Sequence, residues 1–330
     1  MSRRFARRRG RGMVGRQDAH GLTVALLCCT LTLAARDGWA GDVEPGVSGT
    51  VSIEEGYTDN VRWDKNLRDG AWYTTFEGEG TWQRKPRGWL PHRLGGLMRA
   101  RVYSGYGNRD YAEVGPTIGY DWKLVSLTID YRYSPNHLRV DPATTIGAFA
   151  DVHNLSSELR SKFGKNKRWT ALLKVDFDSE FYDPGFRDRN FFQETVEAGL
   201  RCRATPMITP RASVAFSTRD AISSNFDRED VGLLFGFDLN LPAGIRGMFR
   251  FEKTWRNFLV GYPQDSAGQK NNNYHREDDA YNLESGLDFP VPWTSATTVK
   301  LRYRHRDNES SRPDRNFYVN EASLRLSYEF

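Results

Sequence analysis

Long apolar runs and cysteine are scarce in this sequence. Beyond residue 41 no stretch of 18 apolar residues occurs, and a helix needs about 20 of them to cross a bilayer. Cys28 and Cys29 lie within the first forty residues, so Cys202 has no partner for an intramolecular disulfide. The few cysteines and histidines show no metal-ligand spacing. The sequence therefore excludes insertion by membrane helices and a disulfide scaffold, and we expect no cofactor or metal.

The first forty residues have the composition of a secretory signal. An arginine-rich start precedes an apolar stretch from Leu22 to Ala35, and Gly38-Trp39-Ala40 places small residues where a signal peptidase cuts. We predict a cleaved signal over 1–40, with the cut between Ala40 and Gly41, and one domain over 41–330. The alternative is a transmembrane anchor, but the apolar stretch is shorter than the roughly 20 residues that an anchor needs.

The basic balance of the chain comes from this amino-terminal segment. A net charge of +5 would favour a nucleic-acid partner. The first forty residues hold eight of the 47 Lys and Arg but two of the 42 Asp and Glu, which leaves 39 basic and 40 acidic residues. The predicted mature domain is close to neutral, so we expect no nucleic-acid partner.

Apolar and polar residues alternate along long segments of the remaining chain. From Trp169 to Phe181 the odd positions are almost all apolar and the even ones mostly polar, and 125–133 and 231–239 show the same pattern. Strands of a membrane barrel alternate in this way, because one face meets lipid and the other meets the interior. A soluble sandwich or propeller also alternates, but soluble strands average about 5 to 6 residues. The pattern favours an all-β fold, a transmembrane antiparallel up-and-down β-barrel.

The same pattern predicts about fourteen strands, within a range of 12–16, and bacterial single-chain barrels have an even number. The candidates are 47–58, 71–84, 94–104, 111–123, 124–134, 149–163, 168–182, 192–205, 208–219, 230–241, 245–256, 279–289, 295–306 and 317–330.

The connectors between these segments differ in length, which predicts an orientation. The segments 164–167, 241–244 and 290–293 are short and rich in turn residues. Longer polar connectors alternate with them and are predicted to be loops, among them 135–148 and the longest, 257–278. Because outer-membrane barrels have short periplasmic turns and longer outer loops, we expect the short connectors to face the periplasm. Trp82, Trp122, Trp169 and Trp293 all lie beside predicted periplasmic turns, where indole rings favour the bilayer interface.

The last strand ends in apolar residues at alternate positions, namely Leu324, Leu326, Tyr328 and Phe330. This ending resembles the assembly signal of Gram-negative outer-membrane β-barrels, and the chain is similar in size and strand number to porin-like barrels of about fourteen strands. The resemblance implies an outer-membrane location in contact with lipid and lipopolysaccharide. It also implies periplasmic chaperones and the barrel assembly machinery as partners. Whether the barrel is a monomer or an oligomer stays open.

The lumen-facing positions predict the function of such a barrel. They carry many charges, and the basic ladder on the last strands favours anionic solutes, because charge lining an aqueous pore tunes its selectivity. We predict a channel for small polar or anionic solutes, although these charges could instead pair with acids and only hold the wall in shape. The predicted lining residues are Arg99, Arg101, Asp130, Arg132, Lys174, Asp176, Asp178, Arg246, Arg250, Glu252, Lys300, Arg302, Arg304 and Arg325.

Two other functional classes share the architecture. The segment from Gly56 to Val61 resembles the opening of barrels that export polysaccharide or assemble surface proteins. A hydrolase would need a general base and a polarised water. His153 and Asp176 lie on neighbouring predicted strands but on opposite faces. We therefore predict no enzyme and no catalytic residues.

The predicted cleavage can be tested on the protein recovered from membranes. We expect its first residue to be Gly41, because the small residues at Gly38 and Ala40 fit a signal peptidase site. Amino-terminal sequencing measures this directly. A chain that keeps residues 1–40 would favour the anchor instead.

Overall fold

The computed structural model describes residues 45–60, 69–84, 90–140, 147–223, 226–259, 276–294, 296–311 and 315–330. The predicted signal and its cleavage site at Ala40 and Gly41 lie outside the described residues. So does most of the predicted 257–278 loop. Within the described part of the chain, no helix is long and apolar enough to span a membrane.

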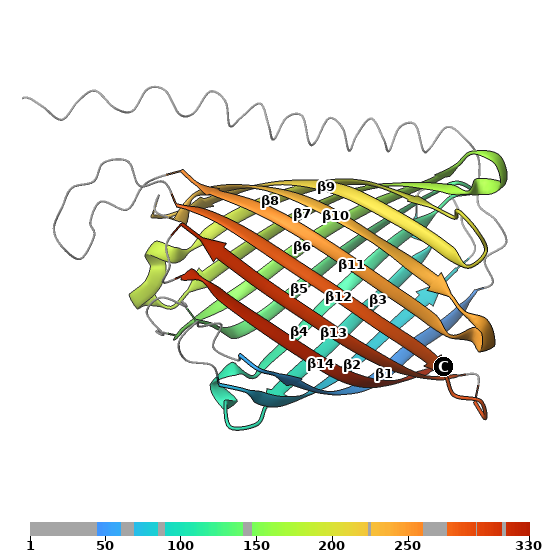
Figure 1. Cartoon of the computed structure of the whole chain (residues 1–330), viewed down its shortest axis with the longest axis horizontal. Helices are drawn as coiled ribbons and strands as arrows, with labels where there is room; N and C mark the ends of the chain where they lie inside the picture. Colours follow the sequence, from blue (N-terminus) through green and yellow to red (C-terminus); the bar gives the residue numbers. More distant parts are fainter. Residues whose placement is uncertain are drawn as a thin grey trace, which may run out of the picture.

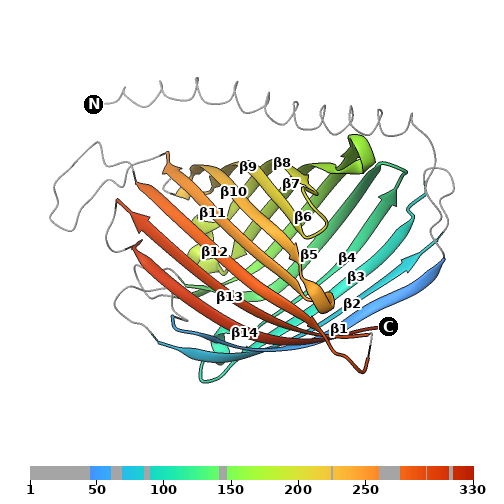
Figure 2. The same cartoon turned by 45° about the vertical axis from the view of Figure 1, so that its right-hand side comes forward.

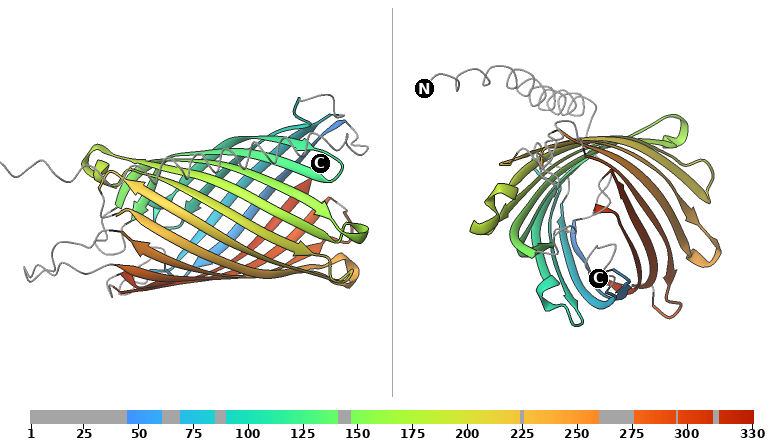
Figure 3. Two further views of the ribbon diagram at one scale, coloured as in Figure 1. Left: turned by 90° about the horizontal axis from the view of Figure 1, so that it is seen from above. Right: turned by 60° about the vertical axis from the view of Figure 1, so that its left-hand side comes forward.

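Fourteen antiparallel strands form one closed barrel, in which each strand pairs with its neighbours in sequence and β1 pairs with β14 (Figures 1 and 3). The predicted fold class and strand number are confirmed. Figure 2 shows the strands inclined to the long direction of the barrel. The strands are β1 Gly46–Thr58, β2 Ala71–Gln83, β3 Arg93–Tyr103, β4 Tyr111–Asp121, β5 Val125–Val140, β6 Gly147–Phe163, β7 Trp169–Tyr182, β8 Phe191–Cys202, β9 Ile208–Ala221, β10 Arg228–Asn240, β11 Arg246–Phe258, β12 Glu277–Pro290, β13 Thr297–Ser310 and β14 Phe317–Glu329.

The wall has its apolar side chains on the outside. Phe76, Leu233 and Phe235 are 52%, 48% and 54% exposed, while lumen-facing Thr75 and Ser327 are 1% and 2% exposed. A soluble barrel would show the reverse. The outward pattern is what a wall surrounded by hydrocarbon requires, because no polar group there could find a water partner.

Several strands are longer than the alternation predicts. The predicted strand 124–134 continues as β5 to Val140, beyond Pro135, and the register with β6 shifts between Ser134 and His137. A β-bulge inserts an extra residue and bends the strand, so the strand continues beyond a proline that lacks an N–H donor. The prediction that 135–148 is a loop was therefore wrong over the part that the two strands occupy.

The short connectors are tight turns at one end of the barrel. Gly164, Asn166 and Lys167 have positive φ in the turn after β6, and Ala243 and Gly244 have positive φ in the turn after β10. The carboxyl terminus lies at this end (Figure 1), which we call the turn end. The opposite end, the loop end, carries the 3-10 turns η1 Gly107–Arg109 and η3 Pro184–Arg189.

Hydrogen bonds close the seam between β1 and β14 at both ends. At the turn end the N–H of Gly49 donates to Phe330 O and the N–H of Phe330 donates to Gly49 O, each at 3.0 Å. At the loop end Asn320 donates from its backbone N (2.7 Å) and from Nδ2 (2.6 Å) to the carboxylate of Asp59. The Gly56–Asn60 motif therefore ends in a clasp across the seam, and the terminal Phe330 completes the opposite end.

Removing the Asp59 clasp tests its contribution to stability. We expect Asp59→Ala to lower the free energy of unfolding by about 1–3 kcal/mol, because the amide of Asn320 loses its acceptors. Urea unfolding in detergent or lipid measures this. Glu229→Ala, which removes an acid at the loop end of β10, is the control and should have little effect. Equal stability of both variants would contradict a role of Asp59 in closure.

Candidate functional site

A basic cavity occupies the lumen, and its lining reaches the loop end at Thr58 and Phe317. Its volume is about 820 Å³, and its lining holds eleven Lys or Arg side chains but four Glu. Alternation along each strand places these side chains inward, and the closed register brings strands distant in sequence around one space. The basic residues are Arg99, Arg101, Arg109, Arg219, Arg228, Arg256, Lys300, Arg302, Arg304, Arg306 and Arg325, and the acids are Glu54, Glu180, Glu284 and Glu321.

The structure brings together part of the predicted lining. Arg99, Arg101, Lys300, Arg302, Arg304 and Arg325 line the cavity. The other predicted residues do not line the cavity, although the register of strand pairing places them at lumen-facing positions. They are Asp130, Arg132, Lys174, Asp176, Asp178, Arg246, Arg250 and Glu252.

The alternation did not single out five arginines of the cavity. Arg109 lies in the 3-10 turn η1, and the other four lie near strand ends. Arg219, Arg256 and Arg306 stand at the last position of their predicted strands, and Arg228 falls just before one. The structure extends all four strands at the loop end, so these side chains belong to the wall. The alternation pattern could have identified these four arginines, because each one lies an even number of residues from the inward-facing residues of its strand.

An ion-pair network crosses the seam on one side of the cavity. Arg325 donates from Nε to Glu54 (2.7 Å) and lies 3.1 Å from Glu77. Arg101 lies 3.4 Å from Glu54, and Arg99 lies 2.7 Å from Glu77. These contacts join β14, β1, β2 and β3. Glu54 is only 5% exposed, so its charge depends on the two arginines that surround it.

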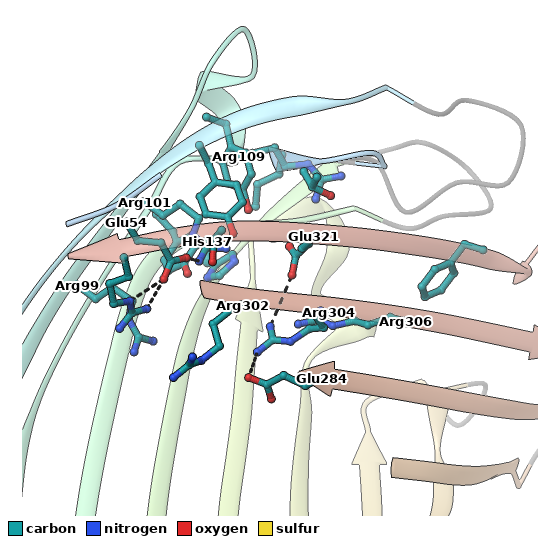
Figure 4. A pocket seen from close by; sticks show the side chains of 18 of the residues that line it. Glu54, Arg99, Arg101, Arg109, His137, Glu284, Arg302, Arg304, Arg306 and Glu321 are labelled. Carbon is teal, nitrogen blue, oxygen red and sulfur yellow. Dashed lines mark hydrogen bonds and ion pairs between the residues drawn. The ribbon is translucent and has the colours of Figure 1, made fainter. Parts of the chain in front are cut away.

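Other predicted lining residues are also paired with acids. Arg304 lies between Glu284 (3.7 Å) and Glu321 (3.6 Å), as the dashed lines in Figure 4 show. Arg302 forms an ion pair with Asp288 at 2.5 Å. Away from the cavity, Arg132 with Asp130 (3.3 Å) and Lys174 with Asp176 (2.8 Å) form pairs within their own strands.

Aromatic side chains make up another part of the lining. The guanidinium of Arg101 lies 4.1 Å from the ring centre of Tyr73. Tyr111 and His137 stack with their ring centres 4.7 Å apart. Both rings line the cavity with Tyr103. The cavity therefore offers flat apolar faces as well as positive charge.

The residues considered for hydrolysis are not brought together. His153 lies on the outer face, where its Nδ1 is 2.7 Å from Tyr131 Oη and its ring is 4.9 Å from that of Tyr133. Asp176 lies on the lumen face, where its carboxylate is 2.8 Å from Lys174 Nζ. In the described residues no three His, Cys, Asp or Glu side chains form a group that could hold a metal.

The chain resembles solved outer-membrane barrels in fold. The outer membrane channel DcaP of Acinetobacter baumannii superposes with a TM-score of 0.50 at 10% identity, over 89% of this chain and 100% of DcaP. The anion-selective porin of Comamonas acidovorans (TM-score 0.44, 7% identity, 87% and 99% covered) and OccAB4 of A. baumannii (0.44, 9%, 86% and 98%) are also similar. No family model and no curated protein matches the chain. With its closed wall and apolar exterior, the chain has the fold of a porin-like outer-membrane β-barrel.

Replacing the buried carboxylate of Glu54 tests the ion-pair network at the seam. We expect Glu54→Gln to destabilise the barrel by about 3–5 kcal/mol, because Arg101 and Arg325 lose their shared counter-charge. Glu55→Gln is the matched control, since Glu55 is exposed on the outer side and accepts a single hydrogen bond from Thr74. Denaturant midpoints of the two variants give the comparison. A larger effect at Glu55 would contradict the network.

Proposed function

We propose that this protein is a passive channel for small polar solutes that prefers anions. The observation that carries the proposal is the charge of the cavity, where eleven basic side chains face four acidic ones. An aqueous space with an excess of one charge concentrates ions of the opposite sign. Anions would therefore be enriched at the loop-end mouth relative to cations.

The ion pairs do not cancel this excess. Every carboxylate of the cavity lining could neutralise one basic side chain, and seven basic side chains would still be in excess. Acids outside the lining reduce this excess further, because Glu77, Asp230 and Asp288 form ion pairs with arginines of the lining. Lys300 also lines the cavity and makes no ion pair or hydrogen bond within the described residues.

The position in the cell is part of the same proposal. Residues 1–40 would direct export, and the carboxyl-terminal strand ending at Phe330 would be read by periplasmic chaperones and the barrel assembly machinery. The apolar exterior would then contact outer-membrane lipid and lipopolysaccharide, with the loop end outside. This orientation is supported by the tight turns at the opposite end, as in outer-membrane barrels.

The motif from Gly56 to Val61, which favoured a role in export or surface assembly, has a structural explanation over its described residues, Gly56 to Asn60. Asp59 bonds to Asn320, and Asn60 Nδ2 donates to Tyr318 O at 2.8 Å. Gly56 has no side chain because the ring of Tyr73 occupies that space. The motif is accounted for by closure of the seam and requires no exported polymer.

Ion selectivity tests the proposed function. We expect the refolded protein in a planar bilayer under a KCl gradient to show a reversal potential shifted toward that of chloride. Lys300→Gln should lower the anion-to-cation permeability ratio by roughly twofold, since a unit charge about 8 Å away in water contributes about 0.5 kcal/mol.

Lys253→Gln is the control, because Lys253 lies on the outer face with Tyr281 and Asp279. It removes the same charge without changing the lumen and should leave the ratio unchanged. Preference for potassium, or absence of any conductance, would contradict the proposed function.

A further inference from the structure

Three arginines on adjacent strands gather at the loop end of the cavity and are held by neutral amides. Arg219 on β9 donates from Nε to Gln193 Oε1 at 2.9 Å, and Arg228 on β10 donates from Nη2 to the same oxygen at 3.4 Å. Arg256 on β11 donates from Nη1 to Asn308 Oδ1 at 3.1 Å. All three line the cavity. We call these three residues the amide-held cluster.

This anchoring differs from that of the arginines near the seam. Arg101, Arg304 and Arg325 each lie within 4 Å of at least one glutamate, and that contact both positions and neutralises the guanidinium. A glutamine or asparagine oxygen positions a guanidinium but leaves its charge in place. Within the described residues Arg219 and Arg256 have no acid within 4 Å, so they are oriented and still able to bind an anion, whereas Arg228 also forms an ion pair with Asp230.

Aromatic rings support the cluster from the wall. The guanidinium of Arg219 lies 3.7 Å from the ring centre of Phe191, and that of Arg228 lies 6.0 Å from the ring centre of Phe258. The two rings are 8% and 5% exposed. Stacking on a buried ring restricts the guanidinium without using its terminal hydrogen-bond donors.

The acids near the cluster leave donors uncommitted. Asp230 lies 3.1 Å from Nε of Arg228, and Glu180 accepts a hydrogen bond from Tyr182 Oη at 2.6 Å. Within the described residues, neither terminal nitrogen of Arg219 makes a hydrogen bond, nor does Nη2 of Arg256. These three terminal nitrogens belong to neighbouring arginines of like charge. Such a group of like charges is stable only when water or an anion contacts it.

The number of guanidinium groups favours a phosphate over a carboxylate. A phosphate monoester carries three terminal oxygens and a charge of about −1.5 to −2 at pH 7, and arginine recognises it through paired N–H donors. A carboxylate offers two oxygens and one charge. Three guanidinium groups on neighbouring strands can each contact one phosphate oxygen.

The opposite wall fits the rest of such a solute. In a ring of fourteen strands, β3 lies seven positions from β10, so Tyr103 lies on the far side of the barrel from the cluster. The stacked Tyr111 and His137 are on the neighbouring strands β4 and β5. These rings line the same cavity, and sugar or aromatic rings pack well on such flat faces.

We propose that Arg219, Arg228 and Arg256 form a binding site for the phosphate group of a small soluble phosphate ester, whose organic part extends toward Tyr103, Tyr111 and His137. The site deepens the proposed function, since it rests on an open anion-passing lumen and names its solute class. It captures the solute at the loop-end mouth before passage.

Block of the chloride current by glucose 6-phosphate tests the site, with glucuronate as a carboxylate of similar size. We expect the wild-type protein in planar bilayers to be blocked by glucose 6-phosphate at about tenfold or more lower concentration than by glucuronate. The double variant Arg219→Gln/Arg256→Gln should raise the half-blocking concentration of glucose 6-phosphate by about tenfold or more, because two charge-assisted contacts are lost.

The matched control removes the same charge from another strand of the cavity wall, β13. Lys300→Gln/Arg302→Gln should raise the half-blocking concentration by only a few-fold, through the weaker long-range field. Equal effects of the two double variants, or equal block by both solutes, would overturn the site. Arg219→Lys, which keeps the charge but loses the paired donors, should weaken block by glucose 6-phosphate and spare block by glucuronate.

Two readouts separate failure of the site from failure of the proposed function. Chloride preference of the wild-type protein without stronger block by glucose 6-phosphate would overturn the site alone. Calorimetric titration of the refolded protein with glucose 6-phosphate measures binding independently of conductance. A channel without anion preference that still binds this ester through Arg219 would overturn the proposed function and support the site.

Discussion

Every backbone group in the wall must find its partner on a neighbouring strand, because hydrocarbon offers none. This requirement permits no free edge, so β1 has to meet β14. The seam is where residues distant in sequence are brought together. Asp59 bonds to Asn320 at one end, and Gly49 exchanges backbone hydrogen bonds with Phe330 at the other. The ion pairs of Glu54 reinforce the middle from the lumen side.

Closure also determines where charge accumulates. A wall with lipid outside has to direct its polar side chains inward, and fourteen strands enclose a space in which they remain hydrated. The seam side of this space is neutralised by glutamates, which hold Arg101 and Arg325 in place. Farther around the wall, on β9 and β11, Arg219 and Arg256 are held by amides and form no ion pair within the described residues. The lumen is thus asymmetric, with a structural side and a binding side.

Alternation predicted the fold well because it reports the one contrast that a membrane barrel cannot avoid. The segment from Trp169 to Phe181 became β7 with its lumen face as expected. The predicted strand boundaries at the loop end were less accurate, because polar residues are compatible there with either a strand or a loop. Pro135 indicated a loop, but a bulge carries β5 past it. Arg228 was missed for the same reason, because it lies at the first position of β10.

The sequence alone determined an all-β barrel of about fourteen strands, its apolar outer face and the side of each strand that carries charge, because these follow from a period of two along one strand. Tertiary structure decided which charges meet. Pairing across the seam gives Arg325 two glutamates, and pairing of β8 with β9 gives Arg219 a glutamine. Whether an arginine is neutralised or free to bind an anion depends on its neighbours across strands, and the order of residues along one strand does not contain that information.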